Sequence, residues 1–457
     1  MSEKITFSLD GKDVTAEPGE TIWQVAKRHG TTIPHLCWKD APGYRADGNC
    51  RACMVEVEGE RVLAASCVRT PSNGMKVKSQ SERAQTARRM VIELLVADQP
   101  KPADAHDSES SFLKWTKAMN VKTSRFPKAK RPKPDNSHAA MTVNLDACIQ
   151  CNLCVRACRE VQVNDVIGMA GRGSGAKIVF DFDDPMGGST CVACGECVQV
   201  CPTGALMPKT IVDANGRGGR IAEREVRSVC PYCGVGCQIT YNINKNKKTG
   251  RDEIAWVEGA GGKSNENRLC VKGRFGFDYV TSPERLTKPL IRLPHKEKGI
   301  NIDPMKPLSH FREATWDEAL DVAVAGLKKI RAGRGPKALA GFGSAKCSNE
   351  EAYLFQKLVR TGFGSNNVDH CTRLCHASSV AALMETIGSG AVTAPFMAVK
   401  DSDVIIVIGA NPTENHPVAA TYFKQAVKRG AELIVMDPRG TAMKRHATHM
   451  LQFKNGA

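Results

Sequence analysis

The sequence predicts a multidomain protein in which α+β domains are followed by an α/β region. Three observations indicate this class. Sixteen of the nineteen cysteines fall into four groups with the tight spacing of metal ligands. One of these cysteine patterns occurs twice, at residues 148–158 and 191–201. Beyond residue 290 the sequence changes to alternating helix and strand patterns. A chain of 457 residues is long enough for three or more domains.

Residues 1–80 are predicted to form a small β-rich domain. Residues 5–9 alternate between apolar and polar with period two, and Asp10-Gly11 supplies a turn. A helix should follow and end at Gly30. One face of this helix is predicted to carry Ile22, Val25, Ala26 and His29.

Residues 81–137 are predicted to combine a helix, over residues 84–98, with a basic linker. Much of the net charge of +16 lies between Lys114 and Lys133, where prolines are interspersed and apolar residues are few. This composition is typical of a solvated surface connector. A docking strip for an acidic partner is the alternative. Nucleic acid is not an expected partner, although the charge alone suggests it.

The cysteines are expected to bind metal. The first six residues contain no apolar core, no twin-arginine pair and no cleavage site, so nothing in them looks secretory. No apolar run approaches the roughly 20 residues of a membrane span. We therefore expect a cytoplasmic chain without a membrane span. In that compartment, C-x-x-C sets are more typical of metal sites than of disulfides.

The cysteine repeat defines a predicted domain over residues 138–222. Each copy has the spacing C-x2-C-x2-C-x3-C, and Pro202 follows the second copy. This is the bacterial ferredoxin pattern, in which the fourth cysteine of each run binds the other cluster. One [4Fe–4S] cluster is therefore predicted on Cys148, Cys151, Cys154 and Cys201. The second is predicted on Cys191, Cys194, Cys197 and Cys158. Zinc is the competing interpretation of C-x2-C pairs, but the doubled pattern disfavours it.

Two further groups each contain four cysteines. Widely spaced thiolates on the β-rich first domain indicate a [2Fe–2S] cluster, and Gly48 and Ala52 leave room for backbone N–H groups beside it. Its predicted ligands are Cys37, Cys50, Cys53 and Cys67. The other group lies in a predicted small domain over residues 223–285. It consists of Cys230, Cys233, Cys237 and Cys270, and its spacing alone fits zinc as well as iron–sulfur.

Residues 286–457 are predicted to be α/β. A helix should start at Thr315 and another at Ser348, because each is followed three residues later by a glutamate, Glu318 and Glu351, in the pattern of a capping box. The first helix is also indicated by apolar residues at helical spacing, namely Trp316, Ala319, Leu320, Ala323, Leu327 and Ile330. The apolar runs at 403–408 and 432–436 are suited to buried parallel strands.

Two segments resemble a known family. The run from Cys230 to Cys237 reads C-P-Y-C-G-V-G-C, and the run from Leu269 to Phe275 reads L-C-V-K-G-R-F. Both are similar to the cluster segment that opens the molybdopterin-dependent oxidoreductases. The first domain and the ferredoxin repeat resemble the N-terminal part of soluble formate dehydrogenase catalytic subunits and of the large complex I iron–sulfur subunit. The resemblance extends over essentially the whole chain.

This resemblance implies a fold and a set of cofactors. The fold is a β-grasp-like [2Fe–2S] ferredoxin domain, a bacterial-type double [4Fe–4S] ferredoxin domain, a small [4Fe–4S] domain and the start of the α/β molybdopterin-binding domains. The cofactors are one [2Fe–2S] cluster, three [4Fe–4S] clusters and a bis-molybdopterin guanine dinucleotide with molybdenum or tungsten. Lys272 would lie between the pterin and the cluster of the Cys230 group.

Cys375 and His376 are the predicted catalytic pair. In formate dehydrogenases the metal takes a protein cysteine or selenocysteine that is followed directly by histidine, whereas related nitrate reductases have methionine after the cysteine. Cys375 also precedes a helical pattern, where the helix dipole favours a thiolate. His376 can exchange a proton near neutral pH. The alternative is a buried cysteine beside a histidine whose hydrogen bonds are satisfied.

Two loops fit the binding of a pterin nucleotide. Each follows a predicted strand, and ligands of open α/β sheets lie beyond the carboxyl ends of strands. Asp437 could accept a hydrogen bond from guanine, and backbone amides near Gly409 and Arg439 could meet phosphates. The candidate residues of the two loops are Gly409, Asn411, Glu414, Asp437, Arg439 and Thr441. Neither loop has the glycine pattern of a nicotinamide site.

The chain departs from the family pattern in two ways. Many relatives bind a further cluster through one histidine and three cysteines. Here His106 stands near the expected histidine position, but no cysteine occurs between Cys67 and Cys148. That cluster is not expected, and His106 is predicted to be an ordinary surface residue. Family members are also much longer, so this chain is expected to be the N-terminal half and to lack a complete active site.

The predicted function is that of a formate dehydrogenase catalytic subunit. Formate would be oxidised at the molybdenum or tungsten centre, and electrons would leave through the ferredoxin pair and the [2Fe–2S] domain. A flavin-bearing partner that reduces NAD is expected, because the chain has no flavin or nicotinamide fingerprint. Two alternatives stay open: a non-catalytic electron-transfer subunit of the complex I or hydrogenase type, and another molybdopterin enzyme such as a nitrate reductase.

Overall fold

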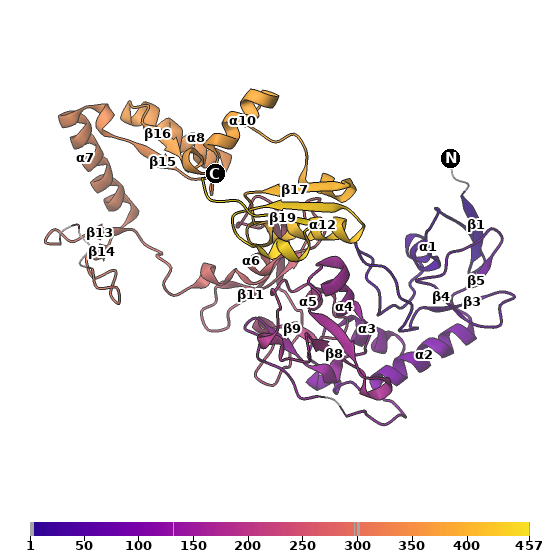
Figure 1. Cartoon of the computed structure of the whole chain (residues 1–457). Helices are drawn as coiled ribbons and strands as arrows, with labels where there is room; N and C mark the ends of the chain where they lie inside the picture. Colours follow the sequence, from indigo (N-terminus) through magenta and orange to yellow (C-terminus); the bar gives the residue numbers. More distant parts are fainter. Residues whose placement is uncertain (1–3, 131, 297, 299–301, 457) are drawn as a thin grey trace. The chain divides into compact units, whose positions relative to one another are not determined.

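The computed structural model describes residues 4–130, 132–296, 298 and 302–456 (Figure 1). The chain divides into two compact units. The first comprises Met1–Asp278 together with Phe396–Ala457, and the second comprises Tyr279–Pro395. Helices and strands are mixed in both, as the sequence predicts. The boundaries of the five predicted segments stay a prediction.

The first unit opens with a five-stranded sheet in the order β2-β1-β5-β3-β4. β1 pairs with β2 antiparallel across the Asp10-Gly11 turn and with β5 in parallel. The elements are β1 (Ile5–Leu9), β2 (Lys12–Ala16), α1 (Ile22–Arg28), β3 (Met54–Val57), β4 (Ala64–Ala65) and β5 (Lys76–Lys78). The predicted strand and helix are therefore confirmed. His29, expected on the inward face of α1, instead lies at the exposed C-terminal cap, where the helix has already ended.

Two helices connect this sheet to the cysteine repeat. They are α2 (Glu82–Val96), which confirms the predicted helix, and α3 (Ser111–Ala118). The predicted linker therefore begins later than expected, because Lys114 and Lys117 belong to α3. Phe112 and Thr116 anchor this helix, and its lysines are exposed.

The cysteine repeat forms a domain in which two short helices share one core. Its elements are β6 (Met141–Val143), α4 (Leu153–Arg156), a π-helical turn (Ala157–Val161), β7 (Ile167–Ala170), β8 (Lys177–Phe180), α5 (Glu196–Val200) and β9 (Leu206–Pro208). β6 pairs with β9, so the start and the end of the domain lie side by side. The buried core around them includes Cys154 and Cys158 of the first run and Cys197 of the second.

A three-stranded antiparallel sheet follows, in the order β10-β11-β12. Its strands are β10 (Arg224–Val229), β11 (Gln238–Lys245) and β12 (Asp252–Gly259), and the short helix α6 (Val271–Phe275) follows. Cys230 and Cys237 lie in the loop between β10 and β11, while Cys270 is the N-cap of α6.

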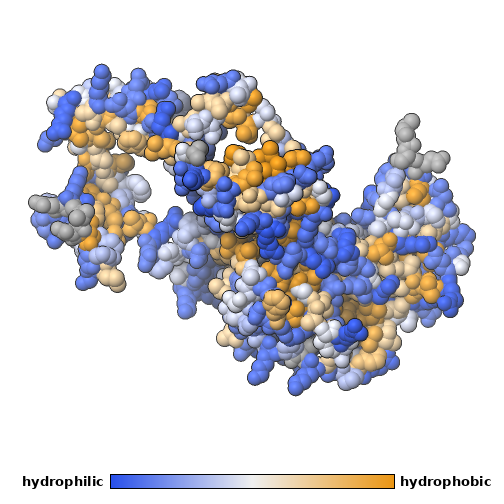
Figure 2. Space-filling model, viewed as in Figure 1, coloured by the Kyte–Doolittle hydropathy of each residue, from blue (hydrophilic) through white to orange (hydrophobic). Residues whose placement is uncertain are grey.

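The last part of the first unit is a small parallel sheet, β17-β18-β19, covered by a helix. The elements are β17 (Val404–Ile408), α11 (Pro412–Asn415), α12 (Pro417–Lys428), β18 (Glu432–Met436) and β19 (His449–Leu451). The predicted parallel pairing is correct, but the expectation of burial is wrong for one face of β17. Ile405 and Val407 pack in the core that includes α12, whereas Val404, Ile406 and Ile408 are exposed. Figure 2 shows hydrophobic side chains gathered over this strand.

The second unit contains longer helices and two strand pairs. Its elements are β13 (Leu290–Arg292), β14 (Phe311–Glu313), α7 (Trp316–Arg334), β15 (Gly341–Gly343), α8 (Asn349–Lys357), β16 (Val368–His370), α9 (Thr372–Cys375) and α10 (Ala377–Ile387). The capping box at Ser348 is complete, but at Thr315 only half of it forms. There the Glu318 carboxylate pairs with Arg312 instead. The predicted helix after Thr315 is confirmed as α7, although no side chain among its described residues is buried.

Within the described part of the chain, no helix combines the length and the apolar character needed to cross a membrane.

Candidate functional site

The four cysteines of the first domain face one another. The Cys53 thiol lies 3.3 Å from Cys67 Sγ, and both side chains are buried. Hydrogen bonds from Cys50 and Cys67 lower the pKa of the Cys37 thiol to about 2. Arg51, between two of the cysteines, has a left-handed φ of 58°, which turns the chain around the group. The sheet therefore gathers four sulfurs that could hold one small cluster.

The two runs of the repeat have the same local backbone. Gln150 and Ala193, at equivalent positions, have φ values of 54° and 53°. Each donates its backbone N–H to the cysteine two residues earlier, at 3.4 Å from Cys148 Sγ and from Cys191 Sγ respectively. N–H groups directed at sulfur stabilise a thiolate and are among the features that tune iron–sulfur clusters. The donor chemistry thus fits two related clusters.

The buried thiols of the repeat sort into two groups across the two runs. Burial raises the pKa of Cys154, and the charges of Cys151, Cys148 and Cys201 raise it further. Burial likewise raises the pKa of Cys194 to about 12, with Cys158 and Cys191 adding to the effect. Cys201 therefore lies with the first run and Cys158 with the second. This supports the crossed ligation, which stays a prediction.

The third group also converges. Burial raises the pKa of Cys237 to about 12, and the charges of Cys230, Cys233 and Cys270 act in the same direction. The loop closes through a hydrogen bond from Cys230 N to Cys237 O at 2.8 Å. Because Cys270 caps α6, the loop between β10 and β11 and the start of this helix meet at one point.

Arg156 joins the first domain to the repeat. Its side chain is 1% exposed and forms an ion pair with Asp47, with Nε 3.2 Å from Oδ2. It also donates to the backbone oxygen of Cys37 and, at 3.5 Å, to that of Cys151. Cys37 and Cys151 share one apolar cluster. The first-domain cysteines and the first run of the repeat are therefore neighbours.

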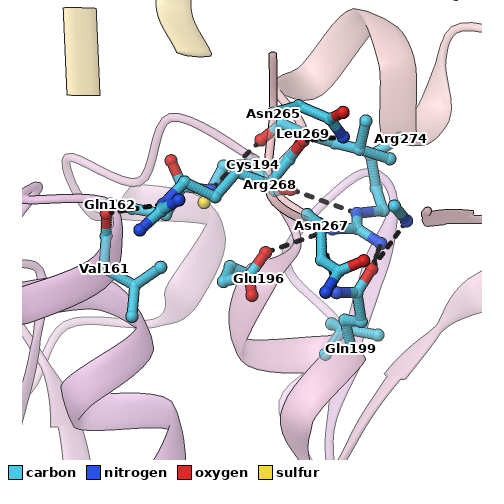
Figure 3. A network of polar contacts seen from close by, with 12 residues as sticks. Val161, Gln162, Cys194, Glu196, Gln199, Asn265, Asn267, Arg268, Leu269 and Arg274 are labelled. Carbon is cyan, nitrogen blue, oxygen red and sulfur yellow. Dashed lines mark hydrogen bonds and ion pairs between the residues drawn. The ribbon is translucent and has the colours of Figure 1, made fainter. Parts of the chain in front are cut away.

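A second polar network joins the repeat to the segment around Cys270 (Figure 3). Arg274 donates to Gln199 Oε1 at 2.6 Å and to Cys194 O at 3.2 Å, and it pairs with Glu196 at 3.4 Å. Arg274 and Glu196 are 3% and 2% exposed, so each compensates the buried charge of the other. Gln162 Nε2 also donates to Leu269 O. These contacts fix the second run beside the third cysteine group.

A cavity of about 460 Å³ lies between these two groups, and its lining includes Cys194 and Cys270. Lys272 enters the same lining and donates from Nζ to Glu414 O at 3.2 Å. The structure thus brings Lys272, from the cluster segment, against the predicted loop that follows β17. The other basic residues of the lining are Lys424, Arg445 and His446.

The two predicted cofactor loops meet at the carboxyl ends of parallel strands. Gly409, with φ 60°, donates its N–H to Met436 O at 2.9 Å and so ties the end of β17 to β18. Asp437 is 3% exposed, and its carboxylate accepts from Arg439 N at 2.8 Å. Thr441 Oγ1 is buried and has no hydrogen-bond partner. An unpartnered buried hydroxyl beside a buried carboxylate fits a polar ligand at this edge.

Two other loop residues differ in exposure. Asn411 is buried and accepts from Thr413 Oγ1 at 2.6 Å, whereas the Glu414 side chain is exposed. The backbone of Glu414 is engaged, with its N–H donating to Asn411 O at 3.1 Å and its oxygen accepting from Lys272. Its role in cofactor binding stays a prediction.

Cys375 and His376 belong to the second unit. Cys375 Sγ lies 3.6 Å from His376 Nε2, at the junction of α9 and α10, and both residues are exposed. The alternative of a buried cysteine beside a satisfied histidine is therefore wrong. Lys272 and the two loops lie in the first unit, so a shared active site stays a prediction.

His106 is not the surface residue that the sequence suggested. It is 6% exposed, with Nε2 2.7 Å from Asp146 Oδ1 and Nδ1 2.8 Å from Gly216 O. Burial lowers the pKa of His106, but the hydrogen bonds to Asp146 and Gly216 outweigh this and raise it overall. Both ring nitrogens are occupied by protein oxygens, so the imidazole has a structural role here.

Sequence reasoning missed the buried lysines and arginines, among them Arg156, Arg274 and Lys424. Arg156 lies between Cys154 and Cys158, and Arg274 follows Cys270 by four residues. Their proximity to cysteines in the sequence was the signal that could have indicated buried roles for these two arginines. Lys424 has no such signal, because its partners lie about 260 residues away in the sequence.

Comparison with protein families assigns four parts of the chain. Residues 2–82 match a 2Fe-2S iron-sulfur cluster binding domain, and residues 147–205 match a 4Fe-4S dicluster domain. Residues 223–282 match the Fe4S4 domain of the molybdopterin oxidoreductases, and residues 285–456 match the molybdopterin oxidoreductase family itself.

Curated relatives match the chain along its whole length. "Probable oxidoreductase YjgC" of Bacillus subtilis (strain 168) is 30% identical over 499 residues, covering 100% of this chain and 48% of that protein. "Putative formate dehydrogenase SH0748" of Staphylococcus haemolyticus (strain JCSC1435) is 28% identical over 498 residues, with the same coverage. The chain spans about half the length of these relatives.

Two of the solved structures that match each cover about half of this chain. An NAD+-reducing [NiFe]-hydrogenase in the H2-reduced state is 29% identical with a TM-score of 0.42, over 45% of this chain and 87% of that one. Acetylene hydratase from Pelobacter acetylenicus is 23% identical with a TM-score of 0.39, over 49% of this chain and 29% of that one.

Proposed function

We propose that this chain, which carries the iron–sulfur and molybdopterin oxidoreductase domains described above, is part of a formate dehydrogenase. Formate would be oxidised to CO2, and the electrons would pass to a flavin-bearing partner that reduces NAD. The observation that carries the proposal is the Cys375-His376 pair within a molybdopterin oxidoreductase domain, since the sequence pattern of formate dehydrogenases has histidine after the metal-binding cysteine. Two relatives bearing the name formate dehydrogenase support it.

The residues have distinct proposed roles in holding the cofactors. Cys375 would supply a thiolate to molybdenum or tungsten, and a bis-molybdopterin guanine dinucleotide would be bound by the loops after β17 and β18. This metal centre supplies two-electron redox chemistry when bound. Asp437 and Thr441 offer a buried acceptor and a free hydroxyl to the nucleotide.

The remaining residues position or exchange protons. His376 Nε2, 3.6 Å from the Cys375 sulfur, can hold the proton that formate oxidation releases. Lys272 keeps the loop at Glu414 against the start of α6 through its 3.2 Å hydrogen bond. This contact links the Cys270 segment to the proposed pterin loop.

The sixteen grouped cysteines would hold one [2Fe–2S] and three [4Fe–4S] clusters, which supply one-electron transfer when bound. The cysteine groups that lie next to each other support an order of electron transfer between the clusters. The third group lies beside Cys194, and the first run of the repeat lies beside Cys37. The [2Fe–2S] domain is therefore the proposed exit toward the partner.

The substrate is tested on the protein purified anaerobically from its host. We expect formate-dependent reduction of methyl viologen, and no oxidation of reduced viologen by nitrate. NAD+ should be reduced only when a flavin-containing partner is present. Nitrate reduction without formate oxidation would contradict the proposal and favour the nitrate reductase alternative. Inactivity toward both substrates, with all clusters present, would favour a non-catalytic electron-transfer subunit.

A further inference from the structure

Lys424 is a buried lysine that the proposed catalytic roles do not use. It lies on α12, is 7% exposed, and reaches from the Phe396–Ala457 segment into the loop that follows Cys158. Its ammonium donates to Gln162 O at 2.8 Å, to Val163 O at 3.0 Å and to Asn164 Oδ1 at 3.0 Å. All three N–H donors of the ammonium are thus matched by oxygen acceptors inside the protein.

The loop that receives Lys424 is held in an unusual backbone conformation. Val163 is β-branched and 1% exposed, yet its φ is 53°. Left-handed backbone is costly for a β-branched residue and persists only where the surrounding structure enforces it. In this conformation the consecutive backbone oxygens of Gln162 and Val163 both accept hydrogen bonds from the Lys424 ammonium group.

Asn164 connects the charge of Lys424 to a cluster cysteine. An ammonium group has no acceptor, so the amide oxygen of Asn164 must face Lys424. The amide nitrogen is then directed away and lies 3.9 Å from Cys194 Sγ. One side-chain amide thus contacts both the buried charge and a predicted ligand of the second ferredoxin cluster.

The attachment of α12 does not depend on this charge. The next residue, Gln425, donates to Glu160 O and Val161 O, at 3.1 and 2.9 Å. Thr421 donates to Gln162 Oε1 at 3.2 Å. Neutral side chains therefore already fasten the helix to the same loop, and a buried cation is not needed for docking alone.

The charge of Lys424 extends into the cavity between Cys194 and Cys270. Burial, Lys424 and Arg445 together lower the pKa of His446, another lining residue, to about 4. Lys424 therefore contributes positive charge to the cavity between the second run of the repeat and the third cysteine group.

We propose that Lys424, acting through Asn164, raises the reduction potential of the [4Fe–4S] cluster held by Cys191, Cys194, Cys197 and Cys158. This inference rests on the cluster assignment of the proposed function. Reduction adds a negative charge to the cluster, and a nearby buried cation stabilises that charge. A hydrogen bond to a cluster sulfur acts in the same direction. Lys424 is therefore a positioning residue that acts on the electron-transfer step between the Cys191 and Cys230 groups.

The test is a redox titration of the anaerobically purified protein, followed by electron paramagnetic resonance. In Lys424→Gln, the reduced-to-oxidised ratio of one [4Fe–4S] signal should fall about ten-fold at a fixed ambient potential, equivalent to about −59 mV for a one-electron couple. The [2Fe–2S] signal should be unchanged, because its cysteines lie in another domain. Lys424→Arg, which keeps the charge, should retain the parental ratio.

Lys428→Gln is the matched control. Lys428 is on the same helix and donates to Arg159 O at 2.8 Å, but its side chain is 45% exposed, so water screens its charge. This variant should leave every midpoint unchanged. An equal shift in Lys428→Gln, a common shift of all clusters, or no shift in Lys424→Gln would overturn the inference.

Asn164→Asp is a second test of the proposed effect on the reduction potential, for the case in which Lys424→Gln loses its clusters. The substitution keeps the acceptor for Lys424 and replaces the donor near Cys194 by an anionic oxygen, so the same signal should shift to lower potential. An unchanged potential would overturn the inference while leaving the proposed function intact. A parental protein without iron would instead refute the cluster assignment, and this inference with it.

Discussion

Cys375→Ala should abolish formate oxidation and leave all four clusters reducible by dithionite. Cys375 lies outside the four cysteine groups, so its removal breaks no iron–sulfur site. If its thiolate binds the metal, the reacting centre loses a donor, and several kcal/mol of transition-state stabilisation are lost with it. A loss of about 4 kcal/mol lowers the rate about a thousand-fold. The measurements are formate-dependent viologen reduction and the cluster signals of the dithionite-reduced protein.

Cys371→Ala is the control for this variant. Cys371 is also exposed and precedes α9, four residues from Cys375, but it has no assigned role. It should retain most of the parental activity. Equal behaviour of the two variants, or near-parental turnover in Cys375→Ala, would contradict the formate dehydrogenase proposal and favour an electron-transfer subunit.

Cys158→Ala should damage the cluster of the second run of the repeat, although Cys158 belongs to the first run in sequence. Cys191, Cys194 and Cys197 all respond to the charge of Cys158. A [4Fe–4S] cluster that lacks one of its four thiolates is lost or degraded. Iron analysis and electron paramagnetic resonance should therefore show the loss of one [4Fe–4S] cluster.

Two reference variants identify which cluster is lost. Cys194→Ala removes a predicted ligand that belongs to the second run, and Cys151→Ala removes a predicted ligand that belongs to the first run. The spectrum of Cys158→Ala should match that of Cys194→Ala. A match with Cys151→Ala would show that each run binds its own cluster, and the crossed assignment would be wrong.

Much of the local structure could be predicted because it depends on neighbouring residues. Period-two alternation identified β1, and the Ser348–Glu351 pair identified the start of α8. The apolar runs of β17 and β18 indicated parallel strands, which also placed Gly409 and Asp437 at one edge of a sheet. The repeat could be predicted as a ferredoxin pair because its doubled cysteine spacing is characteristic of cluster ligands.

The failures have a different cause: each depends on tertiary contacts, or on competition between side chains, that a local sequence pattern does not reveal. His106 is buried because Asp146 and Gly216 occupy both ring nitrogens. Glu318 does not complete its capping box because Arg312 binds its carboxylate. The expectation of burial on both faces of β17 assumed covering layers that a strand pattern cannot reveal.

The buried cations show the same limit. Arg156, Arg274 and Lys424 each connect the repeat to another segment of the chain. In sequence they are ordinary basic residues among 64 lysines and arginines. Only the folded arrangement shows that each has lost its water and gained specific oxygen partners.

The iron content of the anaerobically purified protein tests the central claim most directly. One [2Fe–2S] and three [4Fe–4S] clusters on sixteen cysteines predict about fourteen iron atoms per chain. Zinc should be present only in trace amounts. About eighteen iron atoms would mean that a further cluster exists despite the engaged ring nitrogens of His106. Stoichiometric zinc in place of iron would contradict the account of this chain as an iron–sulfur electron carrier.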